Sequence, residues 1–279
     1  MTTALPDFPV TTSNSMLPML FEPPLLNPAP GGLYPVVTWT EVGADQPSRH
    51  LTGVQFRSAG NFPGDSQVGA WDAPWCSVPD LDSAARKEGE RGGELDPFEP
   101  VVTWGVDSCD LTEPSRREVE QRAQQALRLR EPVVVAREFA ERLKLDAADL
   151  GATPQSDDPV TALAGIEGAL AEANVLGYIH LSPDWLVHLV AMNAITRNGS
   201  RWVSPSGHIL VFDGGYVAGL GDQIIATSEP FGWRDQVAVR TGIDERRNLY
   251  IAVAERGVVV GYEACIAAVT IIVPEEPTP

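Results

Sequence analysis

Residues 248–262 read Asn248-Leu249-Tyr250-Ile251-Ala252-Val253-Ala254-Glu255-Arg256-Gly257-Val258-Val259-Val260-Gly261-Tyr262. Apolar and β-branched residues fill both halves of this stretch, which predicts two strands, Leu249–Ala254 and Val258–Val260. Another run of the same kind, Ile266–Val273, follows after a short break. The chain is therefore expected to end in β-strands.

Upstream of this stretch the pattern alternates between helices and strands. Asp158 followed by Pro159 is typical of a helix start. The buried face of that helix is marked by Leu163, Ile166, Leu170 and Ala173. A third helix is expected from Ser182-Pro183 to Asn198-Gly199. Strands are expected at Leu176–Leu181, Ile209–Phe212, Gln223–Thr227 and Gln236–Arg240. These elements together predict an α+β fold.

A long helix is expected in the first half of the chain. It follows a strand predicted to be buried, Val101–Val106, and its start is predicted from the capping box Ser115-x-x-Glu118. Helical periodicity continues to about Leu145, which at ~1.5 Å per residue gives a length of roughly 45 Å. Pro132 interrupts the pattern and predicts a bend. A helix of this length is too large to be covered by one small domain.

The N-terminal segment, Met1–Gly32, combines many prolines with apolar side chains. Such a density of proline favours extended backbone and prevents a helix. The apolar positions expected to contact a groove are Phe8, Leu17, Leu20, Phe21, Leu25 and Leu26. An extended apolar arm cannot bury itself, so the groove belongs either to its own subunit or to a neighbouring one.

Between the arm and the long helix the sequence predicts a hairpin and a long loop. The runs Tyr34–Val42 and His50–Arg57 are rich in β-formers and are separated by a turn-prone stretch. Residues Ser58–Pro100 are irregular and rich in Gly, Pro, Asp and Trp. A loop of this length is unusual in a compact domain and tends to be functional.

The composition of the chain argues against several classes of protein. The 279 residues carry 20 Lys+Arg against 38 Asp+Glu, a formal net charge of -18. Sequence-specific nucleic-acid binding is disfavoured, because affinity for DNA comes largely from cationic side chains. A protein shell that encloses DNA without binding it tightly is compatible with this charge. Neither a secretory signal nor a membrane helix is expected, so the chain is expected to be soluble and made in a cytoplasm.

Motifs for catalysis and metal binding are weak. His180 and His188 do not have the i, i+4 spacing of a helical metal pair, and the three cysteines lie far apart. The glycine-rich run Asp213–Asp222 lacks the order of a phosphate-binding loop and leads into another strand. We therefore expect no catalytic, cofactor-binding or metal-binding residues.

The order of elements from Thr161 to Thr270 resembles that of one known family. It runs from a helix at Thr161–Ala173 through Tyr178–Trp185, Gly207–Val211 and Gly221–Ile225 to the closing run Asn248–Arg256. This order is similar to that of the major capsid proteins of tailed bacteriophages and of encapsulins, which share the Hong Kong 97-type fold. The Trp-rich stretch between Ser58 and Cys76 further resembles virion proteins of actinobacterial phages.

The resemblance implies a division of the chain into five parts. Residues 1–33 correspond to the N-terminal arm and 34–100 to the extended E-loop with its strands. Residues 101–150 correspond to a peripheral domain with a long bent spine helix, and 151–245 to an axial α/β domain. Residues 246–279 correspond to closing strands shared by the two domains.

The function implied by this resemblance is structural, not enzymatic. Subunits would form the pentamers and hexamers of an icosahedral shell that packages double-stranded DNA, with scaffold, portal and decoration proteins as further partners. The shell would be assembled in the host cytoplasm, without a membrane, and found in the virion. Some relatives lock their shells with a Lys–Asn isopeptide bond, for which Lys87 and Asn248 match by residue type.

Three other readings stay open at the level of sequence. An encapsulin would have the same fold and enclose a protein cargo. A neck or tail component of a virion would form rings of fixed symmetry. An enzyme would use the Asp213–Asp222 loop. Particle geometry separates a closed shell, a ring and a discrete oligomer from one another.

Overall fold

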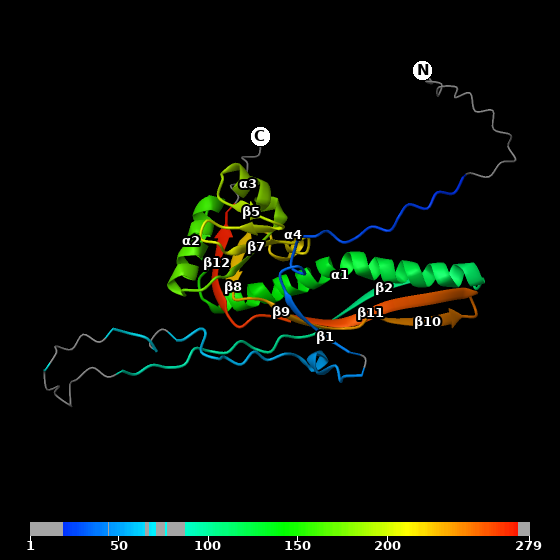
Figure 1. Ribbon diagram of the computed structural model, residues 1–279, viewed down its shortest axis with the longest axis horizontal. Coiled ribbons are helices and arrows are strands. Elements are labelled where there is room, and N and C mark those ends of the chain that lie inside the picture. Colours follow the sequence, from blue (N-terminus) through cyan, green and yellow to red (C-terminus); the bar gives the residue numbers. More distant parts are fainter. Residues whose placement is uncertain (1–18, 44, 65–66, 71–75, 77–86, 273–279) are drawn as a thin grey trace, which may run out of the picture.

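The computed structural model describes residues 19–43, 45–64, 67–70, 76 and 87–272, which form two sheets connected by one long helix (Figure 1). The helix α1 (Glu113–Asp149) lies along an elongated sheet at its N-terminal end and reaches the second sheet at its C-terminal end. The molecule is therefore extended, with a compact lobe at one end of a long sheet-and-helix layer.

The elongated sheet is organised around β11 (Leu249–Gly261), which pairs on both edges. β2 (Val101–Cys109) pairs along one edge, from Tyr250↔Cys109 to Val258↔Val101. The other edge carries β10 (Ala238–Asp244) and then β9 (Phe231–Asp235). The sequence predicted two strands where the structure has one. Gly257 lies between them without ending the strand, because it pairs with Val102 of β2. The side chain of Leu51 packs where a Cβ of Gly257 would be.

The α1 helix covers one face of this sheet through small and apolar side chains. Val119, Ala123 and Leu127 pack against Tyr250, Ala252 and Ala254 of β11. Two boundary predictions were wrong. The helix begins at Glu113, after Thr112, and Ser115 and Glu118 lie inside it; it ends at Asp149 instead of Leu145. Its 37 residues span roughly 55 Å at ~1.5 Å per residue. The helix is continuous through Pro132, and a bend there stays a prediction.

The second sheet forms the compact lobe, with the strand order β3-β12-β8-β4-β7-β6-β5. Its strands are β3 (Gln155–Ser156), β4 (Tyr178–Leu181), β5 (Thr196–Asn198), β6 (Arg201–Val203), β7 (Ile209–Phe212), β8 (Gln223–Thr227) and β12 (Cys265–Ile271). α2 (Pro159–Glu172) packs on one face, and the C-terminal half of α1 packs on the other together with α4 (Tyr216–Gly219).

The helix starts in this lobe are only partly as predicted. Asp158 caps α2 by accepting hydrogen bonds from the N–H groups of Val160 and Thr161, as the sequence indicated. The third helix is much shorter than expected. A single 3-10 turn, η2 (Pro183–Trp185), leads into α3 (Leu186–Ala191). Asn198-Gly199 does not end that helix but forms the turn between β5 and β6.

The predicted hairpin of Tyr34–Val42 with His50–Arg57 is wrong. β1 (Thr38–Val42) pairs in parallel with β9, starting at Thr38↔Phe231. The second run is divided between a 3-10 turn, η1 (Arg49–Thr52), and a single bridge that joins Val54 to Phe98. The first run thus finds its partner far along the chain, and the second pairs with the returning limb of the long loop.

Candidate assembly surfaces

The N-terminal arm leaves the body at a fixed point near Asp213. The N–H of Leu33 donates to Asp213 Oδ2 at 2.8 Å, and the N–H of Gly215 donates to Oδ1 at 2.9 Å. Burial raises the pKa of the Asp213 carboxyl. Gly32 has φ +95, and a Cβ there would collide with this carboxylate. The root of the arm therefore requires glycine next to a buried acceptor.

A second contact fixes the arm root to α1 and to β11. Glu131 is 3% exposed and accepts hydrogen bonds from the Tyr34 hydroxyl at 2.5 Å and from Arg256 Nε at 2.8 and 2.9 Å. Burial, followed by the negative charge of Glu131, raises the pKa of Tyr34. A buried carboxylate with an arginine and a hydroxyl partner is satisfied. This cluster joins three segments that are distant in sequence.

Beyond its root, the described part of the arm runs alongside α1 (Figure 1), and its apolar side chains are exposed. Gln125 Nε2 donates to the carbonyl of Leu26 at 2.7 Å, and Arg128 donates to the Asn27 side chain. The exposed fraction is between 69% and 92% for Met19, Leu20, Phe21, Leu25 and Leu26. Phe8 and Leu17 of the predicted contact set lie outside the described residues.

The outer face of the elongated sheet, away from α1, is apolar and exposed along β2. Val102, Trp104 and Val106 are 57%, 65% and 47% exposed. The prediction that Val101–Val106 is a buried strand is wrong for this outer face. Only alternate residues point at α1, and Gly105 lies so close to it that an added Cβ would be 2.5 Å from the carbonyl of Ala123. A groove of about 450 Å³ continues this face between Leu51, Val102 and Arg240.

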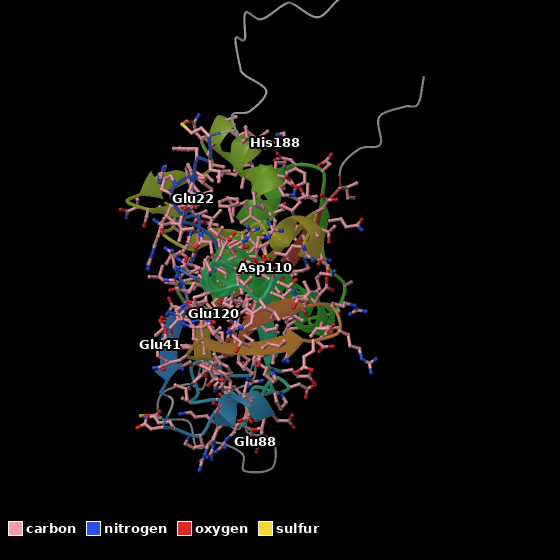
Figure 2. All side chains as sticks on the ribbon, turned by 90° about the vertical axis from the view of Figure 1, so that its right-hand side faces the viewer. Glu22, Glu41, Glu88, Asp110, Glu120 and His188 are labelled. Atoms are coloured by element: carbon pink, nitrogen blue, oxygen red, sulfur yellow. The ribbon has the colours of Figure 1, made fainter. Side chains whose placement is uncertain are left out.

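The long loop between residues 53 and 100 leaves the body through an aromatic root. Phe56 and Phe98 meet edge to face at 5.3 Å between ring centroids, and Phe98 contacts Tyr262 at 5.0 Å. Gly261 has no room for a side chain beneath these rings. Figures 1 and 2 show the loop at the far side of the molecule from α3, with Glu88 and His188 at opposite ends.

The structure does not bring Lys87 and Asn248 together within one subunit. Lys87 belongs to the returning limb of the loop, whereas Asn248 lies in the turn between β10 and β11 with φ +54. The loop and this turn point to opposite ends of the molecule (Figure 1). A covalent bond between them would have to join two subunits, and it stays a prediction.

His180 is buried in the core and contacts two hydroxyl groups. Its Nδ1 lies 2.9 Å from the Tyr216 hydroxyl, and its Nε2 lies 3.0 Å from the Thr227 hydroxyl. Burial lowers the pKa of His180 to about 3, so the ring is neutral. Across the described residues, no group of three or more His, Cys, Asp or Glu side chains could hold a metal ion.

The Asp213–Asp222 run contains the short helix α4 between β7 and β8. Asp213 at its start holds the backbone of the arm and of the run itself. We therefore assign the run a packing role. No helix in the described part of the chain is long and apolar enough to cross a membrane.

Comparison with known proteins gives a match at the level of structure alone. No protein-family model matches the chain, and none of the curated proteins does. A solved structure from Microbacterium phage Oxtober96 aligns with a TM-score of 0.51 and 12% identity, covering 94% of this chain and 96% of that chain. The mature capsid of bacteriophage PhiM1 aligns at 0.49 and 12%, covering 95% and 93%. An encapsulin complex from Synechococcus elongatus aligns at 0.49 and 11%, covering 88% and 89%.

The alignment with the Microbacterium phage structure spans nearly the whole of both chains. The chain has the Hong Kong 97-type fold, the fold of phage major capsid proteins and of encapsulins. The predicted α+β fold is thereby confirmed. This is a structural fold of capsids and not the fold of an enzyme family. The predicted actinobacterial phage origin stays a prediction.

Several residues that shape these surfaces were missed by sequence reasoning. Glu131 with Arg256, and Asp213 with the arm, join segments more than a hundred residues apart. The pair Arg142 and Asp146 did carry a local signal, because i, i+4 spacing places opposite charges side by side on a helix.

Proposed function

We propose that this chain is a major capsid protein, whose copies form pentamers and hexamers of a closed icosahedral shell around double-stranded DNA. The observation that carries the proposal is the fold itself, which aligns over 94% of this chain and 96% of the Microbacterium phage structure. Scaffold, portal and decoration proteins would be its partners during assembly in the host cytoplasm, and the virion would be its final location.

Apolar surfaces left exposed in the single subunit support a role in assembly. The arm residues Leu20, Phe21, Leu25 and Leu26 and the β2 residues Val102, Trp104 and Val106 are exposed. Clusters of exposed apolar side chains mark interaction sites in soluble proteins. In a shell, each subunit would bury such surface against several neighbours, and weak contacts would sum by multivalency.

The acidic charge favours a wall that encloses a genome without binding it tightly. The net charge of -18 disfavours non-specific attachment to DNA. Packaged DNA would then be held by the geometry of the shell. An encapsulin would have the same fold and no packaged genome, so the nucleic-acid content of purified particles separates the two.

Expression of the full chain followed by negative-stain electron microscopy and sedimentation tests the proposal. We expect closed particles tens of nanometres across, with nuclease-protected DNA in particles isolated from their native source. Rings of fixed symmetry would indicate a neck or tail component, and protein cargo without DNA would indicate an encapsulin. Discrete small oligomers, also in the presence of the native partners, would contradict a shell. A ladder of covalent multimers on a denaturing gel, absent in Lys87→Arg, would support the Lys87 crosslink.

A further inference from the structure

The two limbs of the loop between residues 53 and 100 lie side by side where the structure describes them. Val54 and Phe98 exchange both backbone hydrogen bonds at 2.9 Å. Farther out, a Cβ on Gly64 would be 2.5 Å from the carbonyl of Glu90, and one on Gly92 would be 2.6 Å from the carbonyl of Phe62. Where it is described, the loop therefore consists of two adjacent limbs that join the body at Val54 and Phe98.

Arg142 of α1 fastens the returning limb. Its Nη1 and Nη2 donate to the carbonyls of Pro97 and Asp96 at 2.9 and 2.7 Å, and its Nε donates to Asp146 at 2.8 Å. The guanidinium also lies 4.1 Å from the ring centroid of Phe98. Asp146 is itself fixed by the Tyr262 hydroxyl at 2.6 Å. The planar guanidinium of Arg142 thus holds two consecutive carbonyls of this limb against α1.

Glu263 fastens the outgoing limb from a different element. It follows β11 and accepts hydrogen bonds from the N–H of Ala59 at 3.3 Å and from Asn61 Nδ2 at 2.7 Å. Its own N–H donates to the Ser228 hydroxyl at 2.9 Å, which ties this anchor to the compact lobe. The loop is thus held at two places, one on each limb: Arg142 of α1 holds the returning limb, and Glu263 after β11 holds the outgoing limb.

We propose that Arg142 and Glu263 aim the loop in the free subunit, so that its direction is set before it meets a neighbouring subunit. The proposal rests on the proposed shell function. A loop whose orientation is already fixed loses little conformational entropy when it docks on a neighbouring subunit, and this favours association. A loop free to swing would dock at several angles, and shells would close less often.

Hydrogen exchange on the unassembled subunit tests the aiming itself. In Arg142→Lys and in Glu263→Ala we expect exchange in peptides 53–64 and 92–98 to rise about tenfold, because hydrogen bonds to charged groups are lost. Lysine keeps the charge beside Asp146 but lacks the planar fork that reaches both carbonyls. Arg122→Ala, on the same helix and bonded to Glu118 and Asp107, is the matched control and should leave these peptides unchanged.

Electron microscopy of the same variants tests the consequence. We expect the fraction of closed, uniform particles to fall several-fold in both loop variants, with thermal unfolding of the body unchanged. Unchanged exchange in both variants would overturn the proposal, and so would raised exchange with normal shells. If the unsubstituted chain forms no shell under any condition, the shell function fails, while the exchange data still decide whether the two residues aim the loop.

Discussion

His180 illustrates how single residues stabilise this fold without taking part in chemistry. Its ring is fully buried between β4 and α1, with the ring of Phe139 at 5.4 Å and hydroxyl partners from Tyr216 and Thr227 on its two nitrogens. The site suits a neutral imidazole, because both partners are uncharged and water is excluded. The charged form is therefore disfavoured in the folded state.

The buried ring predicts a pH dependence of stability. The pKa of His180 is lowered to about 3 in the fold, so below its ordinary value of 6.5 the unfolded chain binds a proton that the folded chain does not. Stability from this group is complete above pH 6.5 and declines as the pH falls towards 3. Between pH 6.5 and 5 the loss is ~2 kcal/mol, at ~1.4 kcal/mol per pH unit.

Urea unfolding of the unassembled subunit at pH 7, 6 and 5 measures this effect. The His180→Gln variant should lose less stability on acidification than the original chain, because its side chain does not titrate. His188→Gln on α3 is exposed and serves as the control. Equal pH slopes for the original chain and His180→Gln would contradict the assignment.

At the scale of elements, β2 and α1 pack closely against each other at Gly105, where the strand backbone leaves no room for a side chain next to the helix backbone. A Cβ at this position would be 2.5 Å from the carbonyl of Ala123 and 2.7 Å from the N–H nitrogen of Leu127. We expect Gly105→Ala to destabilise the subunit by about 2 kcal/mol, because the backbone of the helix would have to move away.

The matched control for this substitution is Gly242→Ala in β10, where an added Cβ meets nothing within 4 Å. Its effect should stay within about 0.5 kcal/mol. Chemical denaturation of both variants gives the comparison. A Gly105→Ala variant as stable as Gly242→Ala would show that the helix can shift at no cost.

An element can be predicted from the sequence when the contacts that form it join residues close together in the chain. The cap of α2 at Asp158 was predictable, because the capping acceptor and its donors lie within three residues. The pairing of β1 with β9 was not, because its partner is almost two hundred residues away. The unbroken β11 was not predictable either, because its central residues Glu255, Arg256 and Gly257 pair with β2, which lies far upstream in the sequence.

At the scale of the whole molecule, the sequence predicted the class of fold better than it predicted the surfaces. The order of helices and strands sufficed for the resemblance, and the apolar arm was visible in its composition. The exposed β2 face, the arm root at Asp213 and the loop anchors come from contacts between distant segments. Such contacts follow from the folded topology and not from any local run.

The arm provides the prediction that belongs to the assembled particle. Deletion of Met1–Gly32 should leave a folded, unassembled subunit, because the described arm contacts α1 through few polar groups, whereas Leu33 and Tyr34 of its root remain. Shell formation should be lost, since Leu20, Phe21, Leu25 and Leu26 supply apolar surface that the subunit itself does not bury.

A milder variant separates loss of apolar contact from loss of the backbone. Serine at these four positions keeps the arm and its bond from Gln125 to the Leu26 carbonyl, since that bond uses the main chain. Sedimentation and electron microscopy should show unassembled subunits for the deletion and a several-fold lower yield of shells for the serine variant. Normal shells from the deleted chain would mean that the arm binds only its own subunit. If the serine variant forms normal shells and the deletion does not, the arm contacts its neighbour through its backbone or through residues 1–18.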